Sequence, residues 1–491
     1  MQIKIDDIPL YVRMVILNLQ TAGFEAFLVG GCVRDIVMGR TPHDWDITTI
    51  ATPEQIIGLF PHTYYNNDFG TVGVVVDGAT QNIETVIEVT PFRGEGTYSD
   101  SRHPDSVVWV KDIREDLARR DFTCNAIALN ITDMSFIDPY NGLSDIKDKI
   151  LRCVRNADDR FSEDALRMMR LVRFSAQLGF TIDPVTHESA KRNAFKLNNI
   201  AIERVQDEFK KLLMTAQPMS GLIVAHVTGI LQYFLPELEN GIGISQNQAH
   251  SFDVWEHNLR TLQHATDKGW DLNLRLSALF HDISKPETRR YSEEKRDYTF
   301  YGHDVVGGRV TRVIMNRMKF PKDQIDKVSL MVRWHMFFSD TEQIILSAVR
   351  RLIVNVGRDN IWDLMNLRIC DRVGTGRPKE EPYRFRKYQS MIEQALVDPI
   401  SLKQLKIDGA GIMTVTQETP GPKIGFILNA LFQEVLENPE KNTAQYLEQR
   451  ALHMKSLPIS DLKALADKGK ELAAEKNDEQ LTEIKKQFHV K

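Results

Sequence analysis

The stretch FLVGGCVRDIVMGRTPHDWDITT, residues 27–49, decides how the N-terminal part of this chain folds. Its apolar start at residues 27–29 predicts a short strand, and Gly30 and Gly31 predict a turn that leads into a helical segment. Paired glycines let backbone N–H groups approach a ligand closely, as a turn that holds phosphate requires. The stretch therefore predicts a strand, a phosphate-holding turn and a helix in succession.

The same stretch ends with two acidic residues, Asp44 and Asp46, on either side of Trp45. We expect both on a second strand, and because strand side chains alternate between faces, their carboxylates should point to the same side. Two carboxylates in that position can hold divalent cations beside a triphosphate. A bare glycine pair or a bare Asp-x-Asp is more often a turn and two solvated acids, but the combination with Arg34 and Asp35 at this spacing is far more specific.

This combination resembles the signature of the class II tRNA nucleotidyltransferase and poly(A) polymerase family. The resemblance implies an α+β fold. A polymerase-β-like nucleotidyltransferase head, built of a mixed sheet with helices, would be followed by all-α neck, HD and C-terminal helical domains. It also implies that Gly30, Gly31 and Arg34 bind nucleotide phosphates, and that Asp44 and Asp46 hold two Mg²⁺ ions.

A chain of 491 residues is long enough for about three or four domains. We expect a nucleotidyltransferase head at 1–145, a helical neck for base selection and RNA binding at 146–215, a helical linker and HD metal-binding domain at 216–375, a C-terminal helical tRNA-binding region at 376–455, and a charged tail at 456–491.

Composition restricts the partners and the compartment. The net charge is −5, so a nucleic-acid site must be a local patch, and residues 151–215 carry 12 Lys or Arg against 9 Asp or Glu. The four cysteines are scattered without a CxxC pair, which indicates reduced thiols. The N-terminus lacks a signal-peptide pattern, and no apolar run approaches the length of a membrane span. We expect a cytoplasmic protein with no membrane partner, and no stable protein partner is evident.

A third acidic group is expected from the strand that side-chain alternation predicts over residues 82–90. A two-metal site usually takes such a group from a neighbouring strand. Glu88 is the candidate, because it lies between Ile87 and Val89 in the setting that the family uses. The alternative for Glu88 is an exposed acid on an edge strand.

The polar segment that follows, FRGEGTYSDSRHPDSVVWV at residues 92–110, predicts a mobile loop. It matches the family's flexible loop, which is tied to the switch from C to A addition. Arg93, Asp100 and Arg102 fall on the matching pattern.

Arginines and an amide gather in residues 115–130, where Arg119, Arg120, Asp121 and Asn125 match the family's RRDFTxNA motif. Two adjacent guanidiniums suit triphosphate oxygens, and Asn125 can bind a ribose hydroxyl. Asp121 is expected either to orient an arginine or to join the metal site, and the sequence leaves both roles open.

The segment from Ser162 to Gly179 predicts one amphipathic helix. Asp164 and Arg167 are three residues apart and are expected side by side on one face, with Arg170 on the same polar side. An ordinary surface ion pair is the alternative. The pair matches the family's EDxxR motif, which reads the incoming base. A carboxylate beside an arginine can match cytosine and adenine, whose donor and acceptor order is reversed in guanine and uracil.

A second constellation lies in the back half and resembles the H…HD…D ligand order of the HD metal-dependent phosphohydrolase superfamily. Its members are His257, His281, Asp282 and Asp371. Imidazole and carboxylate together suit a divalent transition metal or Mg²⁺. His303 and His335 are candidate ligands for a second metal, although a lone histidine such as His335 on an apolar helix is more often a packed core residue. Phosphatase or 2′,3′-cyclic phosphodiesterase activity is left open.

Together the resemblances imply a template-independent enzyme that adds CMP, CMP and AMP to the 3′ end of tRNA from CTP and ATP, with Asp44, Asp46 and Glu88 as catalytic residues. One alternative is a poly(A) polymerase. Those enzymes commonly carry an arginine-rich element in the head, and residues 61–76 contain no arginine. Enzymes that add only CC or only A are a further alternative. A rival from a different class is an HD phosphohydrolase with an RNA-binding head, against which the intact Asp-x-Asp argues.

Overall fold

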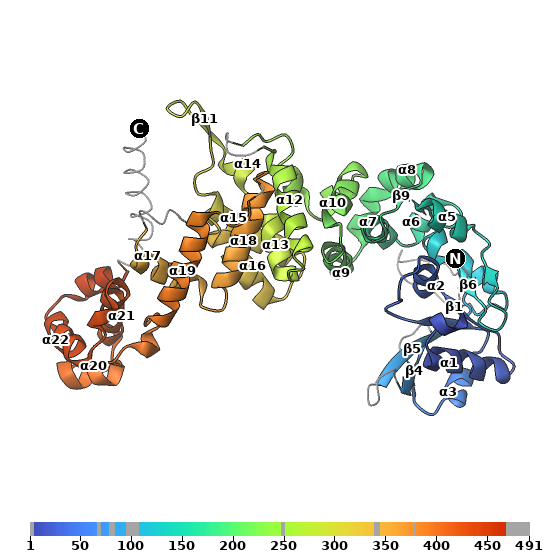
Figure 1. The fold of residues 1–491 in the computed structure, drawn as a ribbon, viewed down its shortest axis with the longest axis horizontal. Helices are drawn as coiled ribbons and strands as arrows, with labels where there is room; N and C mark the ends of the chain where they lie inside the picture. The colour runs from blue at the N-terminus through green and yellow to red at the C-terminus, as the bar shows by residue number, and fades with distance from the viewer. Residues whose placement is uncertain are drawn as a thin grey trace. The chain divides into compact units, whose positions relative to one another are not determined.

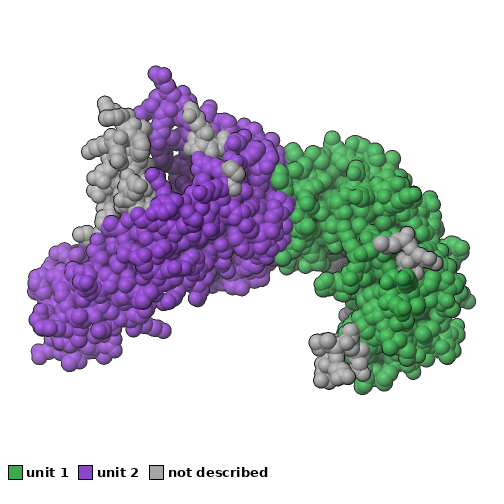
Figure 2. All heavy atoms as spheres, viewed as in Figure 1, with its two compact units in different colours: residues 1–239 green, residues 240–491 purple. Residues whose placement is uncertain are grey.

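The computed structural model describes residues 4–65, 70–77, 84–94, 108–246, 251–337, 344–377 and 379–467. The chain divides into two compact units, residues 1–239 and 240–491 (Figure 2). Unit 1 combines a mixed sheet with helices, and the described part of unit 2 is helical apart from one short hairpin (Figure 1). The predicted α+β class is confirmed. Asp100 and Arg102 of the predicted loop, and the tail from residue 468, lie outside the described residues.

Within the described residues of unit 1, seven strands form one sheet in the order β3-β4-β5-β2-β1-β6-β7. Their bounds are β1 Ala26–Val29, β2 Asp46–Thr49, β3 Thr63–Tyr65, β4 Val72–Asp77, β5 Glu84–Pro91, β6 Ala128–Leu129 and β7 Phe136–Ile137. Strands β2 and β5 run parallel, and the other neighbours run antiparallel. All four residues of β1 are buried, as its apolar sequence predicts.

The strand predicted to carry both aspartates is shorter than expected. β2 begins at Asp46, and Asp44 lies in the bend before it. The register pairs Leu28 of β1 with Ile47 of β2. Because β1 ends at Val29 and the chain turns at Gly30, β1 offers no backbone partner to the residues before Asp46.

Helices surround this sheet and continue into the rest of unit 1. Their bounds are α1 Leu10–Thr21, α2 Gly31–Val37, α3 Pro53–Leu59, α4 Ile113–Ala118, α5 Gly142–Asp148, α6 Ala157–Glu163, α7 Leu166–Leu178, α8 Pro184–Asn193, α9 Ile202–Leu213, α10 Pro218–Val227 and α11 Pro236–Glu239. Helices α1 and α3 pack on each other and on the sheet, and α7 packs between α9 and α10. Two further short strands, β8 Ile150–Leu151 and β9 Thr181–Ile182, pair in parallel.

The single helix predicted from Ser162 to Gly179 is wrong, because two helices cover this segment. Helix α6 ends at Glu163, and α7 starts at Leu166 after extended backbone at Asp164 (φ −143°, ψ 103°). The Asp164 carboxylate accepts a hydrogen bond from the backbone N–H of Leu166 at 3.0 Å. A short acidic side chain that captures a backbone donor in this way competes with the helix ladder, so the helix breaks here. The predicted end at Gly179 is confirmed, with φ +71°.

Unit 2 consists mainly of packed helices, with one short hairpin. Its element bounds are α12 Val254–Asp267, α13 Leu272–Phe280, α14 Lys285–Thr288, β10 Arg290–Ser292, β11 Asp297–Thr299, α15 His303–Arg317, α16 Lys322–Trp334, α17 Leu346–Val356, α18 Ile361–Gly374, α19 Tyr383–Val397, α20 Gly409–Thr416, α21 Pro422–Glu437 and α22 Ala444–Lys455. A continuous apolar core joins α17 to α22. Among the described residues, no helix has the length and apolar character needed to cross a bilayer.

Candidate active site and metal centre

A cavity of about 490 Å³ opens in unit 1 and collects most of the predicted head and neck residues. Those that line it are Gly30, Gly31, Arg34, Asp44, Asp46, Arg120, Asp121, Asn125, Asp164, Arg167 and Arg170. Three predicted residues that the structure describes, Glu88, Arg93 and Arg119, lie outside its wall. Residues far apart in the sequence therefore meet around one space of the size that small-molecule sites have.

The acidic side of the cavity is built on the parallel pair β2 and β5. Asp46 opens β2 and stands directly opposite Glu88 in the register. Burial raises the pKa of Asp46, Arg120 lowers it, and the nearby carboxylates of Glu88 and Asp44 raise it further. The carboxylates of Glu88 and Asp44 thus each repel that of Asp46. Carboxylate oxygens suit Mg²⁺, whose charge would relieve the repulsion.

The glycine turn is favoured by its backbone conformation and by the side chains packed against it. Gly30 has φ +81°, and a Cβ placed there would lie 2.8 Å from Arg120 Nη1 and 3.8 Å from Asp46 Oδ2. The Gly30 N–H donates to the carbonyl of Ile127 at 3.2 Å. This amide therefore ties the turn to its neighbour, and the missing side chain makes room for an arginine beside an acidic group.

A buried acid that sequence reasoning missed holds the two arginines. The side chain of Asp116 is 0% exposed, and its Oδ1 lies 2.8 Å from Arg119 Nη2 while its Oδ2 lies 3.2 Å from Arg120 Nη2. Burial raises the pKa of Asp116, but the two guanidiniums outweigh burial and lower it. The spacing of three and four residues along a helix was the available signal. Asp116 fixes Arg119 away from the cavity and Arg120 towards it.

A second chain of polar contacts crosses from the head to α7. Arg34 is buried and donates from Nη1 to Asn125 Oδ1 at 2.7 Å. Asn125 Nδ2 donates to Asp121 Oδ1 at 3.1 Å, and Arg170 Nε donates to Asp121 Oδ2 at 2.7 Å. Burial raises the pKa of Asp121, but Arg170 and Asn125 outweigh burial and lower it to about 2. These contacts are those of a carboxylate that orients an arginine.

Asp164 and Arg167 do not pair with each other on one helix face, which corrects the expected arrangement. Asp164 Oδ2 lies 2.8 Å from Arg204 Nη2 on α9. Arg167 donates to Glu163 Oε2 at 2.7 Å and to the Arg119 carbonyl at 2.9 Å. Both residues nevertheless line the same cavity, because the break before α7 turns Asp164 towards α9. Arg204 also lines the cavity and is a further residue that the motif did not assign to it.

One face of α7 supplies more of the wall than the motif indicated. Arg173, Phe174 and Gln177 line the cavity after Arg170, at the spacing of a single helix face. The guanidinium of Arg173 lies 4.1 Å from the centroid of the Phe174 ring, and that of Arg170 lies 5.3 Å from it. The helical period starting at Arg170 was the signal that would have found them. Cation–π contacts of this kind add to the hydrogen bonds that Arg170 donates to Asp121 and Arg173 donates to Glu208, and together they hold both arginines beside the space.

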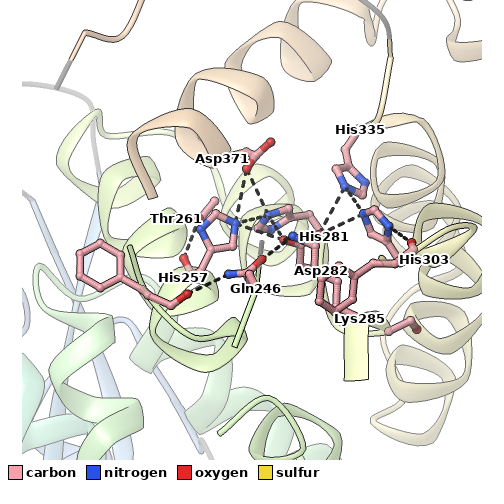
Figure 3. A network of polar contacts seen from close by, with 12 residues as sticks. Gln246, His257, Thr261, His281, Asp282, Lys285, His303, His335 and Asp371 are labelled. Atoms are coloured by element: carbon pink, nitrogen blue, oxygen red, sulfur yellow. Dashed lines mark hydrogen bonds and ion pairs between the residues drawn. The ribbon is translucent and has the colours of Figure 1, made fainter. Parts of the chain in front are cut away.

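The predicted metal ligands of unit 2 meet in a buried cluster (Figure 3). Two groups of three side chains are each arranged to hold a metal ion: His257, His281 and Asp371, and then Asp282, His303 and His335. They come from α12, the end of α13, the start of α15, the end of α16, and α18. His335 is only 1% exposed, as a core residue would be, and it also belongs to the cluster. Burial and a position among the metal ligands are therefore both found for this residue.

Asp282 stands between the two groups. Its Oδ2 lies 3.1 Å from His257 Nε2 and 3.2 Å from His281 Nε2, and its Oδ1 lies 3.2 Å from His303 Nε2. Lys285 Nζ lies 2.5 Å from the same Oδ2 and donates to Gln246 Oε1 at 2.6 Å. Lys285 follows Asp282 by three residues, and this spacing was the signal for a role that the sequence reading did not assign.

Three of the histidines are held in the tautomer that metal binding needs. Nδ1 of His281, His303 and His335 contacts a backbone carbonyl three residues earlier, at 2.8, 2.6 and 2.7 Å respectively. A carbonyl only accepts, so each Nδ1 carries the proton and each Nε2 is directed into the cluster. Imidazole nitrogens with carboxylates suit divalent transition metals or Mg²⁺. The donor set and its orientation therefore fit a metal centre.

Charge in the cluster is balanced internally. Burial lowers the pKa of His281, but the carboxylates of Asp282 and Asp371 outweigh burial and raise it to about 9. A bound cation would take the place of this proton between the two carboxylates.

Comparison with known proteins finds matches to the domains of the chain. Family models match three segments: "Poly A polymerase head domain" at residues 26–152, "Probable RNA and SrmB- binding site of polymerase A" at 179–242, and "HD domain" at 254–373. The chain belongs to the class II tRNA nucleotidyltransferase and poly(A) polymerase family. Membership in this nucleotidyltransferase family implies dependence on a divalent metal ion.

Relatives of this chain include proteins named CCA-adding enzyme. One from Leuconostoc mesenteroides is 42% identical over 270 residues, which is 53% of this chain and 66% of the relative. One from Limosilactobacillus reuteri is 44% identical over 229 residues, 46% of this chain and 55% of the relative. The chain thus spans between half and two thirds of the length of the curated relatives it matches. The crystal structure of the Bacillus stearothermophilus CCA-adding enzyme in complex with CTP is similar with a TM-score of 0.68 at 26% identity, covering 90% of this chain and 96% of that one.

Replacing Asp282 with alanine should weaken metal binding to unit 2 at least about tenfold, because loss of even a partner of a metal ligand typically costs 10–100-fold. The measurement is calorimetric titration of the full chain with Mn²⁺, with metal content after dialysis as a second readout. The matched control is His264→Ala, since His264 lies on α12 with His257 but outside both groups. Equal Mn²⁺ affinity in the Asp282 variant and the wild type would contradict the assignment.

Proposed function

We propose that unit 1 adds C, C and A to the 3′ end of tRNA from CTP and ATP, without a template and with release of pyrophosphate. The observation that carries this proposal is the single cavity that joins Asp44 and Asp46 to Asp164 and Arg167. A carboxylate pair and a base-reading pair in the wall of one nucleotide-sized space are what such a reaction needs. The names of the relatives, and the CTP bound by the Bacillus stearothermophilus enzyme, support the same function.

In the proposed reaction, the 3′-oxygen of tRNA bonds to the α-phosphorus of the nucleotide. The bond from that phosphorus to the pyrophosphate oxygen breaks, and the hydroxyl proton passes to solvent. Asp44 and Asp46, with Glu88 beside them, would hold Mg²⁺. When bound, Mg²⁺ lowers the pKa of the 3′-hydroxyl and offsets the charge of the triphosphate and the departing pyrophosphate.

The arginines bind and orient the triphosphate in this proposal. Arg120 is held beside Gly30 by Asp116, so its guanidinium faces the cavity before a ligand arrives. Arg34 is fixed by Asn125, which limits the directions in which it can donate. Guanidiniums held in this way suit phosphate oxygens because their planar donors are already in place.

Base choice is assigned to Asp164 and Arg167. The Asp164 carboxylate can accept from the amino group that cytosine and adenine share, and Arg167 can donate to the adjacent ring nitrogen. Arg204 holds Asp164, and Glu163 holds Arg167, so the two groups keep separate positions on the wall. Guanine and uracil present the opposite order and would leave both groups unsatisfied.

Poly(A) polymerase and partial CC- or A-adding activities are the alternatives within the class. Separate lanes with CTP alone, ATP alone and both nucleotides distinguish them on tRNA that lacks its CCA end. A tRNA substrate and four buried free cysteines fit a cytoplasmic location.

Unit 2 supports a second candidate activity, the hydrolysis of phosphate esters. The specific observation is the set of six buried ligands with three histidines in the metal-binding tautomer. Water oxygen would bond to phosphorus, the ester P–O bond would break, and the leaving oxygen would take a proton. Lys285 supplies positive charge beside Asp282 for the phosphate. When bound, a divalent metal supplies an activated water and Lewis acidity.

The two activities should separate by mutation. Asp44→Ala should abolish elongation of tRNA lacking CCA in the presence of CTP, ATP and Mg²⁺, because it removes one of the two carboxylates that hold the cations. Asp282→Ala should spare elongation and remove phosphate release from phosphate esters. Gel analysis of the tRNA and a phosphate assay are the two readouts. Full elongation by the Asp44 variant would refute this division of labour.

Asp164→Ala should degrade base selection more than it degrades the affinity for Mg²⁺. Loss of the acceptor removes the contact that favours an amino group, so incorporation of UTP or GTP relative to CTP should rise about tenfold or more, as expected for a lost hydrogen bond to a charged group. Single-nucleotide incorporation rates with each of the four triphosphates measure this ratio. Selectivity equal to that of the wild type would count against the role of Asp164.

A further inference from the structure

The sheet of unit 1 carries an aromatic ring in the same row as two of its carboxylates. The register pairs Asp46 of β2 with Glu88 of β5, Glu88 with Gly73 of β4, and Gly73 with Tyr64 of β3. Residues that are paired across neighbouring strands present their side chains to the same face of a sheet. Tyr64 therefore lies on the face that holds Asp46 and Glu88.

The Tyr64 ring lies flat on the strand next to that of Glu88. A Cβ placed on Gly73 would lie 2.5 Å from Tyr64 Cζ, 2.8 Å from Cε1 and 2.9 Å from Cε2, which are the distances of a point above the ring plane. The residue is 44% exposed, which leaves the opposite side of the ring accessible. An aromatic ring that is supported on one side and accessible on the other is a platform on which bases stack.

The platform is close enough to the carboxylates to serve them. Neighbouring strands lie about 5 Å apart, so a ring on Gly73 is about one strand spacing from the strand that carries Glu88. A nucleotide whose base stacks on Tyr64 can therefore place its sugar beside Glu88 and Asp46.

The sheet order places Tyr64 and the nucleotide cavity on opposite sides of β2. Gly30 and Gly31 at the end of β1 line the cavity, whereas β5, β4 and β3 lie on the other side of β2. Glu88 and Tyr64 lie outside the cavity wall. In the proposed reaction two substrates meet at cations held at the start of β2. Because the triphosphate occupies the β1 side, the RNA end has to approach from the side of β5 and Tyr64.

A cationic side chain reaches the same face. Arg93 Nη2 donates to Thr71 Oγ1 at 2.7 Å, and Thr71 Oγ1 lies 3.2 Å from Thr90 Oγ1. Thr90 follows Glu88 by two residues on β5, so the alternation of the strand puts both side chains on one face. Arg93 thus brings positive charge to the face that carries Tyr64. Contacts of this kind to phosphate position a nucleic-acid strand without reading its sequence.

We propose that the Tyr64 ring stacks on the 3′-terminal base of the RNA and directs the terminal 3′-hydroxyl to the cations held by Asp46 and Glu88. This role rests on the nucleotide addition proposed for unit 1 and gives the second substrate its place. Stacking accepts every base, because each has an aromatic face, so one platform serves an RNA end whose last base changes as nucleotides are added. Tyr64 binds and orients the RNA end and takes no part in bond making.

The kinetic test uses the full chain with tRNA lacking CCA, CTP and Mg²⁺. Tyr64→Leu should lower kcat/KM for tRNA about tenfold, within the range for a lost base stack, and leave KM for CTP unchanged. Leucine still covers Gly73, whereas alanine would also remove the support that an aromatic ring gives to a glycine in a sheet.

Two further variants separate stacking from a structural role. Tyr64→Phe keeps the ring and should retain the wild-type kcat/KM for tRNA. Tyr65→Leu is the matched control, because Tyr65 is an exposed tyrosine of the same strand whose side chain alternates to the other face. Equal losses in the leucine and phenylalanine variants of Tyr64, or wild-type values in both, would overturn the proposed role.

A tRNA whose terminal base is 2-aminopurine reports the stack without catalysis, because the fluorescence of this base falls when it stacks. In saturated complexes without nucleotide, the wild type, Tyr64→Phe and Tyr65→Leu should give equally low emission, and Tyr64→Leu should give higher emission. Equal emission from all four proteins would overturn the stack. Failure of the wild type to add any nucleotide would instead refute the proposed reaction, and the emission would still decide the stack.

Discussion

The backbone at position 30 favours glycine, and the arrangement of unit 1 depends on that constraint. A Cβ there would lie 2.8 Å from Arg120 Nη1 and 3.8 Å from Asp46 Oδ2, in a backbone conformation that favours glycine. The turn therefore lets the end of β1, the first acid of β2 and an arginine from beyond α4 approach one another. The parallel register then adds Glu88 beside Asp46. The residues proposed to bind phosphate and those proposed to bind the cation are thus set next to each other by backbone packing.

Buried charge around this point is organised in linked contacts. Asp116 holds Arg120, and Asp121 joins Asn125 to Arg170 on α7. Removing one member of a buried ion pair lowers the free energy of unfolding by about 3–5 kcal/mol, so these pairs favour the observed side-chain positions. Donors and acceptors fixed before the ligand binds need little reorganisation during a reaction, which is how such sites stabilise developing charge. The same logic holds in unit 2, where backbone carbonyls orient three histidines around Asp282.

Local patterns predicted the parts of this account that depend on local chemistry. The glycine turn and the acidic residues of the first stretch could be predicted because short sequence patterns are enough to indicate strands, turns and pairs of carboxylates. Asp164 could not be placed, since helical periodicity runs through residue 164 and hides the cap that breaks the helix. His335 was ambiguous because burial is shared by core residues and ligands, and its contacts with His303 and Asp282 separate the two cases. Asp116 was missed because it precedes the motif that was matched, whereas its partners Arg119 and Arg120 are the first two residues of that motif.

The central claim is that the carboxylate at the start of β2 holds a catalytic cation. The most direct measurement is tRNA elongation by Asp46→Cys with Mg²⁺, Mn²⁺ or Cd²⁺, with the wild type as the control for Cys32, which contacts the Asp46 carbonyl. A thiolate is a poor ligand for Mg²⁺ and a good one for softer ions. The account predicts loss of elongation with Mg²⁺ and its partial return with Cd²⁺ or Mn²⁺. Wild-type elongation by the variant with Mg²⁺ alone would contradict it.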